Sequence, residues 1–292
     1  MPVNDLTVKL AGAQGHGIES TGPAFAKAIA RTGVYVCGLY DFMSRIRGGH
    51  YFFQIRVNER PIYSHRETVH LLLAFNEESI DLGIDQIPEG GGVIYDAKLK
   101  VDASKIEAKG VRAFAMPLTD IAVEVGDALG VGSKITGGSK VMANTAATAA
   151  AAGIIGLDLA QFDRVLRENF GRRKGSEIAE ANSQVAKAAY EMAAERYGQA
   201  FPWKLKPVPH PKQRVVITGN YALAMGALAA GCQFISAYPM TPASSILEWL
   251  VAHDKYGVVH KQTEDELAAI LFAIGASHVG ARAMTATSGG GF

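Results

Sequence analysis

Hydrophobic and polar positions along the chain predict strands and helices that follow one another in turn. Short aliphatic runs are each followed by a longer stretch whose apolar residues recur at helical spacing. Such alternation is typical of an α/β fold, because each crossover between parallel strands needs a helix. The strands expected in the first part are residues 6–11, 34–38, 51–57, 71–75, 93–95 and 112–116, and the helices are residues 18–31, 77–85, 119–129, 140–155, 158–170 and 177–197.

The pattern breaks at a proline-rich segment, residues 201–211, which contains four prolines. Proline lacks a backbone N–H and favours an extended chain, so the segment predicts a semi-rigid tether. We therefore expect a first domain over residues 1–200, a linker over residues 201–213 and a second domain over residues 214–292.

The second domain begins another α/β series. Its expected strands are residues 215–218, 234–237, 258–260 and 283–287, and its expected helices are residues 220–230, 242–256 and 264–277. A doubly wound sheet needs more strands than these to cover both of its faces. The pattern predicts a domain that is incomplete or that another chain completes.

Composition and charge narrow the function classes. A formal net charge of +1 gives no support to nucleic acid or a membrane surface as a partner. The two cysteines, Cys37 and Cys232, cannot build a four-thiolate metal site, and they indicate a reducing cytoplasm rather than a disulfide-built protein. The N-terminus lacks the pattern of a signal peptide, and the longest apolar stretch, residues 142–157, is too short to span a bilayer. We expect a cytoplasmic protein without a metal site of its own.

A glycine-rich turn, residues 12–17, follows the first strand with the spacing G-x-x-G-x-G. Small residues let backbone amides approach an anion, and the next helix adds its positive end. The spacing differs from the G-x-G-x-x-G of dinucleotide-binding folds, and Asp41 is poorly placed to be their acidic residue. The residues disfavour a nicotinamide site and leave open another anionic ligand or a tight turn without one.

Two arginines, Arg45 and Arg47, precede a Gly-Gly turn after the second predicted strand. Guanidinium groups bind phosphate or carboxylate through paired hydrogen bonds, so the two side chains form a candidate anion clamp. A solvated loop is the alternative. The position after a strand end, where α/β proteins gather ligands, weighs in favour of the clamp.

The loop after residues 234–237 reads Tyr238-Pro239-Met240-Thr241-Pro242. Thr241 suits the N-cap of the following helix and Pro242 suits its first turn. Capping alone would explain the threonine. Its hydroxyl and amide could also meet a carboxylate at the same point.

Two more strand ends in the second domain carry polar loops. Residues 262–267 open a helix with three acids, which stabilise its positive end unless one of them faces a heterocyclic nitrogen. Glu264 and Glu266 are two positions apart and do not share a helix face, so only one of them can point at a ligand. Residues 285–291 form a hydroxyl- and glycine-rich loop that includes Ser288 and Gly289. Three such loops at one sheet edge predict a binding site there.

Together these motifs resemble the 2-oxoacid:ferredoxin oxidoreductases, in particular the subunit in which a gamma domain precedes an alpha domain. The resemblance covers nearly the whole chain. The gamma-like stretches are residues 12–22 and 35–62, and the alpha-like stretches are residues 219–222, 238–242, 262–266 and 287–291. The Tyr-Pro-x-Thr-Pro and Gln-x-Glu motifs are the specific part. The implied fold is a gamma-type α/β domain followed by the first part of a thiamine-pyrimidine-binding, doubly wound α/β domain.

The resemblance also implies an activity, the coenzyme-A-dependent oxidative decarboxylation of 2-oxoglutarate or a related 2-oxoacid, with ferredoxin as electron acceptor. The implied cofactor is thiamine diphosphate, shared with a beta subunit that carries its diphosphate end, Mg²⁺ and a [4Fe-4S] cluster. The implied partners are that beta subunit, ferredoxin and the C-terminal remainder of the alpha subunit as a separate chain.

Site roles are implied in the same way. Glu264 would hydrogen-bond the pyrimidine ring nitrogen and promote its imino tautomer. Thr241 would lie beside the reacting carbon and contact the substrate carboxylate, while Arg45 and Arg47 would meet coenzyme A or substrate at the mouth of the site. The other implied cofactor contacts are Tyr238, Pro239, Ser288 and Gly289.

The chain departs from the family pattern in two respects. Relatives carry a small residue and a glutamine where this chain has Gln14 and His16, and their alpha subunits continue past the position of Phe292. A non-catalytic subunit for assembly or coenzyme A binding remains an alternative. An NAD-linked dehydrogenase is a further alternative, which the glycine spacing disfavours.

Overall fold

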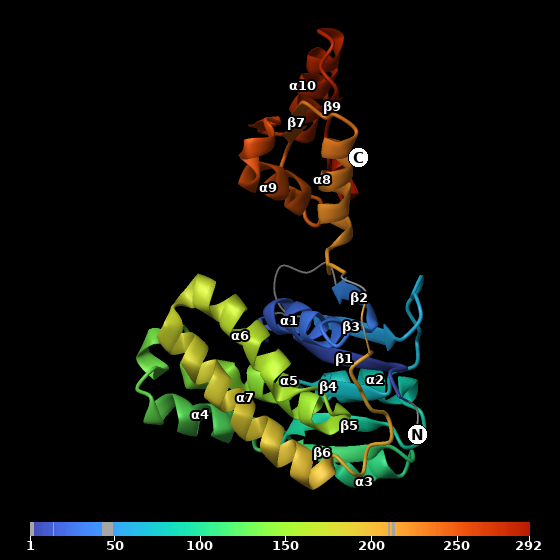
Figure 1. Ribbon diagram of the computed structural model, residues 1–292, viewed down its shortest axis with the longest axis vertical. Helices are drawn as coiled ribbons and strands as arrows, with labels where there is room; N and C mark the ends of the chain where they lie inside the picture. The colour runs from blue at the N-terminus through green and yellow to red at the C-terminus, as the bar shows by residue number, and fades with distance from the viewer. Residues whose placement is uncertain (1–2, 14, 43–48, 210, 212–213) are drawn as a thin grey trace. The chain divides into compact units, whose positions relative to one another are not determined.

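The computed structural model describes residues 3–13, 15–42, 49–209, 211 and 214–292. It divides the chain into two compact units, Met1–Arg214 and Val215–Phe292 (Figure 1). Both units are built from strands and helices in alternation, which confirms the predicted α/β class.

The first unit is organised around a six-stranded sheet in the order β2-β3-β1-β4-β5-β6. Strands β1, β4, β5 and β6 run parallel, whereas β3 is antiparallel to both β1 and β2. The connection from β2 to β3 is too short for a crossover helix, so these two strands pair as neighbours in opposite directions. The strands are β1 (Leu6–Ala13), β2 (Tyr35–Phe42), β3 (His50–Asn58), β4 (Leu71–Ala74), β5 (Gly92–Asp96) and β6 (Arg112–Met116).

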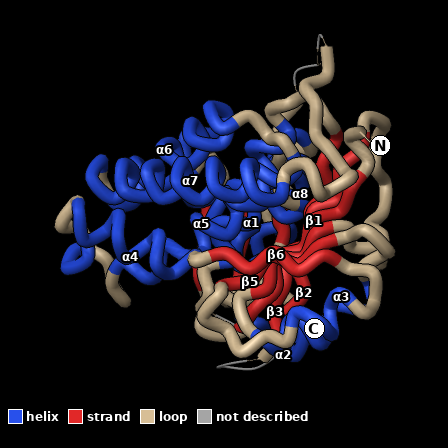
Figure 2. The backbone as a smooth tube through the Cα atoms, turned by 90° about the horizontal axis from the view of Figure 1, so that it is seen from below, coloured by secondary structure: helices blue, strands red, loops and turns tan. Residues whose placement is uncertain are grey.

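Helices cover both faces of this sheet (Figure 2). The larger core lies under α1 (Ile18–Ala30), α5 (Ala143–Ile155), α6 (Leu159–Lys174) and α7 (Ser176–Tyr197), with α4 (Leu118–Ala128) beside them. The smaller core lies under α2 (Glu77–Gly83) and α3 (Ala103–Glu107). Short 3₁₀ turns are η1 (Ile84–Gln86), η2 (Gly132–Lys134) and η3 (Ser139–Met142).

Helix α5 is rich in alanine and almost wholly buried against α7. Its Gly153 lies so close to α7 that a Cβ there would be 2.5 Å from the carbonyl oxygen of Tyr190. Small side chains therefore let these two helices approach each other closely, which explains why a stretch with little polar character lies inside the unit.

The proline-rich region is packed onto the first unit rather than forming the expected tether. We call residues 201–208 the strap. Phe201 is fully buried, and its ring contacts the Trp203 ring at a centroid distance of 5.4 Å. The strap also forms backbone hydrogen bonds, from Leu205 N to Ile155 O at 2.7 Å and from Val208 N to Thr32 O at 2.8 Å. Burial of an aromatic side chain outweighs the extended, solvated state that the prolines favour.

The second unit contains a parallel sheet in the order β8-β7-β9. Residues 215–218, which the sequence predicted to be a strand, are largely exposed and pair with no described strand. The central β7 already has β8 and β9 on its two sides, so residues 215–218 could join this sheet only at an outer edge, and they pair with neither edge strand. The elements are α8 (Gly219–Ala229), β7 (Phe234–Ala237), α9 (Ser244–Ala252), η4 (Asp254–Tyr256), β8 (Val259–Gln262), α10 (Glu266–His278), β9 (Ala283–Met284) and η5 (Gly289–Gly291).

None of the helices in the described ranges has the length and apolar character that a transmembrane span requires.

Candidate functional site

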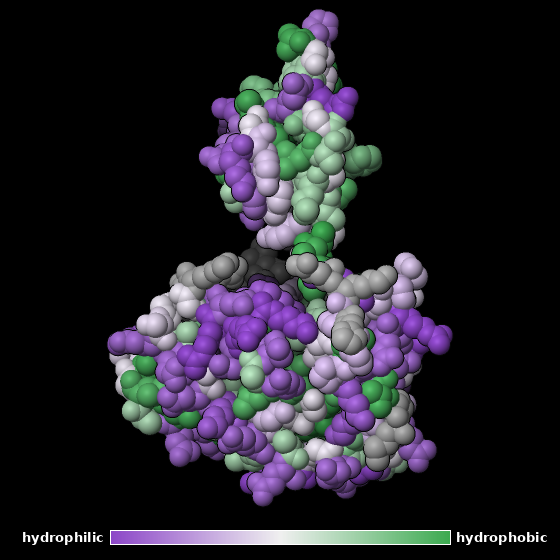
Figure 3. All heavy atoms as spheres, viewed as in Figure 1, coloured by the Kyte–Doolittle hydropathy of each residue, from purple (hydrophilic) through white to green (hydrophobic). Residues whose placement is uncertain are grey.

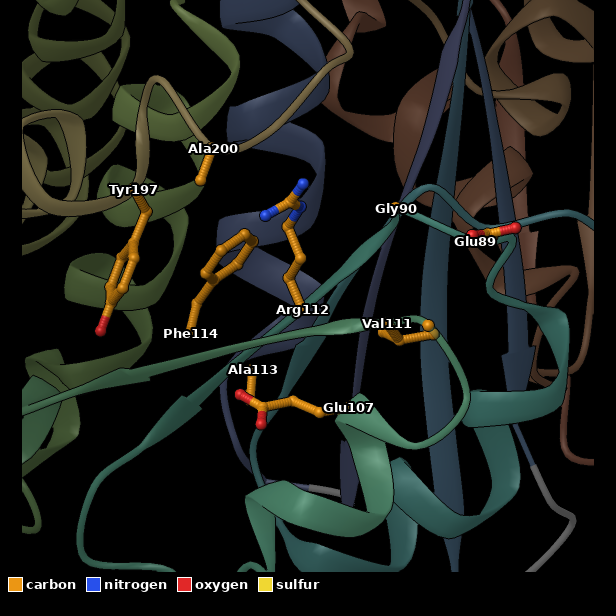
Figure 4. A pocket seen from close by; sticks show the side chains of 10 residues that line it. Glu89, Gly90, Glu107, Val111, Arg112, Ala113, Phe114, Tyr197 and Ala200 are labelled. Carbon is orange, nitrogen blue, oxygen red and sulfur yellow. The ribbon is translucent and has the colours of Figure 1, made fainter.

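A cavity of about 490 Å³ lies beside β6 in the first unit (Figure 4). Arg112 and Phe114 lie on one side of the strand, whereas Ala113 and the Glu107 side chain lie on the other. The cavity is at the amino-terminal end of β6, the opposite edge from the one where parallel sheets gather ligands. Its polar groups do not converge on one point, so we do not assign the functional site to it.

The glycine-rich turn after β1 is closed by its own histidine. The backbone N–H of Ala13 donates a hydrogen bond to His16 Nδ1 at 3.2 Å, and burial lowers the pKa of this imidazole. A Cβ at Gly12 would lie 2.6 Å from His16 Nδ1, so the ring occupies the space directly above the turn. The Ala13 amide is therefore not available to an anion, which weakens the expected role of the turn as an anion cradle. Gln14 lies outside the described residues.

A smaller cavity of about 330 Å³ opens at the start of α1, lined in part by Gly15, Glu19 and Tyr51. The Glu19 carboxylate adds to burial in raising the pKa of Tyr40 to about 12, and it contributes in the same direction at Tyr51. A carboxylate at the mouth repels an anionic ligand. Arg45 and Arg47, the predicted clamp, lie outside the described residues.

In the second unit, three loops leave the carboxyl ends of the parallel strands, where ligands of α/β proteins gather. The loop after β7 carries Tyr238, Pro239 and Thr241. Glu264 comes after β8, and the loop that contains Ser288 and Gly289 follows β9.

A side-chain hydrogen bond joins two of these loops. Ser288 Oγ donates to the carbonyl oxygen of Thr241 at 2.7 Å. Asn220, at the start of α8, supports the same β7 loop: its Nδ2 donates to Pro242 O and to Ser245 Oγ, both at 2.8 Å. The structure therefore brings Thr241 and Ser288 together. Sequence reasoning did not assign a role to Asn220, although a polar amide at the start of an otherwise apolar helix was the available signal.

The helix that follows Thr241 begins later than the sequence predicted. Helix α9 starts at Ser244 with Ala243 as its N-cap, so Thr241 is not the cap and Pro242 is not in the first turn. The carbonyl groups of both residues accept side-chain hydrogen bonds from other elements, which holds them in a turn outside the helix. Capping therefore does not explain Thr241, whose side chain is exposed.

The three acids after β8 take three different positions. Asp265 is the N-cap of α10 and accepts a hydrogen bond from Ala268 N at 2.7 Å, so the helix starts at Glu266 and not at Glu264 as predicted. An aspartate competes well for this position because its carboxylate satisfies a free amide of the first turn. Glu264 precedes the helix and is exposed, with no hydrogen bond or ion pair to any described residue. Glu266 is half-buried.

No group of three or more potential metal ligands of the His, Cys, Asp or Glu type occurs among the described residues. The loops of the second unit carry the exposed Glu264 carboxylate and the hydroxyl groups of Thr241 and Ser288.

Comparison with known proteins decides the family. Residues 7–192 match the family described as pyruvate ferredoxin/flavodoxin oxidoreductase. The chain belongs to this family. Residues 225–292 match a second family, the thiamine-diphosphate-binding domain of pyruvate flavodoxin/ferredoxin oxidoreductases, which contains all three loops of the second unit.

Individual members of this oxidoreductase family resemble the whole chain. A 2-oxoacid:ferredoxin oxidoreductase subunit alpha from Sulfolobus is 29% identical over 98% of this chain and 50% of its own length. The 2-oxoglutarate oxidoreductase subunit KorA of Mycobacterium tuberculosis is 29% identical over 99% of this chain and 47% of its own. The chain spans about half the length of the curated relatives it matches.

A solved structure of the family supports the fold. The 2-oxoglutarate:ferredoxin oxidoreductase of Magnetococcus marinus, with 2-oxoglutarate, coenzyme A and succinyl-CoA bound, is 31% identical and superimposes with a TM-score of 0.84. The match covers 99% of this chain and 48% of that one. The predicted family and fold class are confirmed.

Proposed function

We propose that the chain provides the gamma and alpha parts of a 2-oxoacid:ferredoxin oxidoreductase that acts on 2-oxoglutarate with thiamine diphosphate and coenzyme A. The observation that carries the proposal is the position of Glu264, a carboxylate without a partner among the described residues, at the end of a parallel strand in the thiamine-diphosphate-binding domain. The bound ligands of the Magnetococcus marinus relative support the choice of substrate.

The residues at this edge fit the pyrimidine end of thiamine diphosphate. A pyrimidine ring needs a carboxylate at one ring nitrogen, which Glu264 offers, and polar groups around the ring, which the loops bearing Tyr238, Pro239, Ser288 and Gly289 offer. The bond from Ser288 to Thr241 fixes two of these loops before any ligand arrives.

When bound, thiamine diphosphate supplies the electron sink through which a 2-oxoacid loses carbon dioxide. In the proposed site the exposed Glu264 carboxylate would become covered by the pyrimidine ring and hold a proton at the ring nitrogen, because a carboxylate shares a proton with a heterocyclic base once both are shielded from water. Thr241 presents its exposed hydroxyl to the substrate carboxylate. We propose that Arg45 and Arg47 bind coenzyme A or substrate phosphate and carboxylate groups.

The partners follow from the same proposal. With two cysteines the chain cannot ligate an iron–sulfur cluster by itself, so we propose that a beta subunit carries the [4Fe-4S] cluster, Mg²⁺ and the diphosphate end of the cofactor, and that ferredoxin accepts the electrons in the cytoplasm. The names of the relatives, which are alpha subunits, support the existence of further subunits.

The experiment is to reconstitute the complex and follow coenzyme-A-dependent reduction of a viologen dye with 2-oxoglutarate, pyruvate and other 2-oxoacids. Glu264→Gln should lower the rate by about 10²-fold or more, because a catalytic proton-transfer group is lost. Glu248→Gln, on the exposed side of α9, is the matched control and should leave the rate unchanged. A Glu264→Gln rate within about twofold of the unaltered complex would contradict the carboxylate role.

A second candidate, a non-catalytic assembly or coenzyme A-binding subunit, is favoured by the apolar surface of the second unit. Helix α10 exposes Leu267, Leu271 and Ile274, which recur on one face. Figure 3 shows apolar side chains also over the region of α8. Such surface is typical of subunit contacts. This candidate predicts full activity for Glu264→Gln and loss of the complex when Leu267 and Leu271 are replaced by Lys.

A further inference from the structure

Two carboxylates near the proposed cofactor site have different surroundings. Glu264 is exposed and precedes α10, whereas Glu266 is the first residue of α10 and is half-buried. The Asp265 N-cap lies between them in the sequence, and its side chain accepts a hydrogen bond from Ala268 N. The exposed Glu264 carboxylate is accessible to a ligand, whereas the half-buried Glu266 carboxylate lies against other residues of the unit.

The neighbour of Glu266 is the glycine-rich loop after β9. A Cβ placed on Gly291 would lie 2.7 Å from both Cγ and Oε1 of Glu266, and it would overlap Thr287 Oγ1. The side chains of Glu266 and Thr287 therefore border the same small space, which only a glycine at position 291 leaves free. The loop rests on the first turn of α10 through this contact.

Thr287 supplies an independent observation. Its hydroxyl oxygen is buried and has no hydrogen-bond partner in the described part of the chain. A buried hydroxyl without a partner is unfavourable, so a small rotation that brings it to an adjacent carboxylate oxygen is favoured. The Oε1 atom of Glu266 is the acceptor that borders the same space.

We propose that Glu266 is a positioning residue, which holds the loop of residues 287–291 on α10 by accepting a hydrogen bond from Thr287. The next residue along, Ser288, donates to Thr241 O at 2.7 Å. The support therefore runs from the first turn of α10 through Thr287 and Ser288 to the β7 loop. As a role in catalysis the inference rests on the proposed function, whereas the contact itself is independent of it.

The test is hydrogen–deuterium exchange of the peptide that spans residues 285–292 in the full chain. Glu266→Ala and Thr287→Val should each speed its exchange by about fivefold, the effect of losing one net hydrogen bond. The double variant should add little to either single change, because both remove the same interaction. Glu266→Gln, which keeps an acceptor oxygen, should stay within about twofold of the unaltered chain.

Two control variants separate the possible outcomes. Glu264→Ala and Glu248→Ala should leave the exchange of this peptide unchanged, since neither side chain forms a hydrogen bond or ion pair with a described residue of the loop. Unchanged exchange of this peptide in Glu266→Ala would overturn the inference. An equal acceleration of exchange over residues 234–237 would also overturn it, because the substitution would then have loosened the whole unit and not the loop alone. Activity of Glu264→Gln bears on the proposed function alone, so the two can fail separately.

In the assembled complex, Glu266→Ala should raise KM for thiamine diphosphate by more than it lowers kcat, because a positioning residue acts on binding geometry before chemistry. An effect on kcat alone would contradict the positioning role.

Discussion

Ser288 Oγ lies 2.7 Å from the carbonyl oxygen of Thr241 and donates a hydrogen bond to it, although the two residues are separated by the whole of β8 and α10. The bond links the loops after the neighbouring strands β7 and β9, and the loop that carries Glu264 follows β8, the strand on the other side of β7. Two of the three loops at this sheet edge are therefore held together before a ligand binds, and this lowers the entropic cost of ordering them on binding.

Replacement of Ser288 by alanine should loosen the loop pair without unfolding the unit. We expect the KM for thiamine diphosphate in the assembled complex to rise by about fivefold, the effect of one hydrogen bond of about 1 kcal/mol. Ser244→Ala is the control, since Ser244 forms no side-chain hydrogen bond among the described residues. An equal KM for both variants would mean that the bond to Thr241 has no part in cofactor binding.

Asn220, at the start of α8, also supports the β7 loop. Asn220→Ala removes two hydrogen bonds of 2.8 Å, to Pro242 O and Ser245 Oγ. We expect a loss of about 1–2 kcal/mol in the free energy of unfolding of the second unit, measured by urea denaturation, together with weaker thiamine diphosphate binding. Asn220→Asp keeps only acceptor oxygens and should behave like the alanine variant. Near-native behaviour of the aspartate variant would contradict a role as a donor.

Phe201 tests the packing of the strap. Its side chain is fully buried, so Phe201→Ala should lower the free energy of unfolding of the first unit by about 3–5 kcal/mol. Urea denaturation followed by circular dichroism measures this, with exposed Tyr63→Ala as the comparison. A solvated tether would instead give a change below about 0.5 kcal/mol, which would refute the packed arrangement.

His70 should make the stability of the first unit depend on pH. Its Nδ1 accepts a hydrogen bond from Thr7 N at 2.8 Å, and burial lowers its pKa below the ordinary value of 6.5. Below that pH the unfolded chain binds a proton that the folded imidazole does not yet take up, so the free energy of unfolding falls as pH falls. The decrease begins near the unfolded pKa and continues down to the lower folded one.

The measurement for His70 is urea denaturation at several pH values between about 7.5 and 5.5, the window in which an unfolded histidine titrates. His70→Asn keeps an acceptor for Thr7 N–H and should show a shallower dependence on pH. The pKa values of His16 and His50 are also lowered by burial, so these two residues still contribute to the pH dependence of the free energy of unfolding in this variant. Exposed His65→Asn is the control, and a His70→Asn slope equal to that of the control would disprove the assignment.

Periodicity predicted the elements that bury a wide apolar face. The helix expected at residues 177–197 is α7 (Ser176–Tyr197), and the six strands expected in the first unit are all present. The pattern could not reveal that β3 runs antiparallel to β1, because strand direction depends on partners far along the chain. It also missed α3, a helix of five residues that is too short to show a helical period.

In the candidate site, sequence identified the loops but not the contacts between them. The motifs located Thr241 and Ser288, yet only the fold shows that the serine donates to the threonine carbonyl. The residues alone did not say which of the three acids after β8 caps the helix, and the resemblance singled out only Glu264; the fold assigns Asp265 to the helix cap and leaves Glu266 half-buried. The role of Asn220 was missed because a hydrogen bond from its side chain to the carbonyl group of Pro242, 22 residues away, does not change the hydrophobic periodicity of the sequence.

The strap matters for anyone who wishes to produce the two units separately. Its residues Phe201 and Leu205 belong to the hydrophobic core of the first unit, and Asn4 hydrogen-bonds to Lys206 at the opposite end of that unit's sequence. A recombinant fragment that ends at residue 200, just before the proline-rich segment that looks like a domain boundary in the sequence, would lose these groups. It would also expose the apolar surface that they cover. A fragment that ends at Arg214 keeps them, and with them the side-chain bond from Arg214 to Gly33 O.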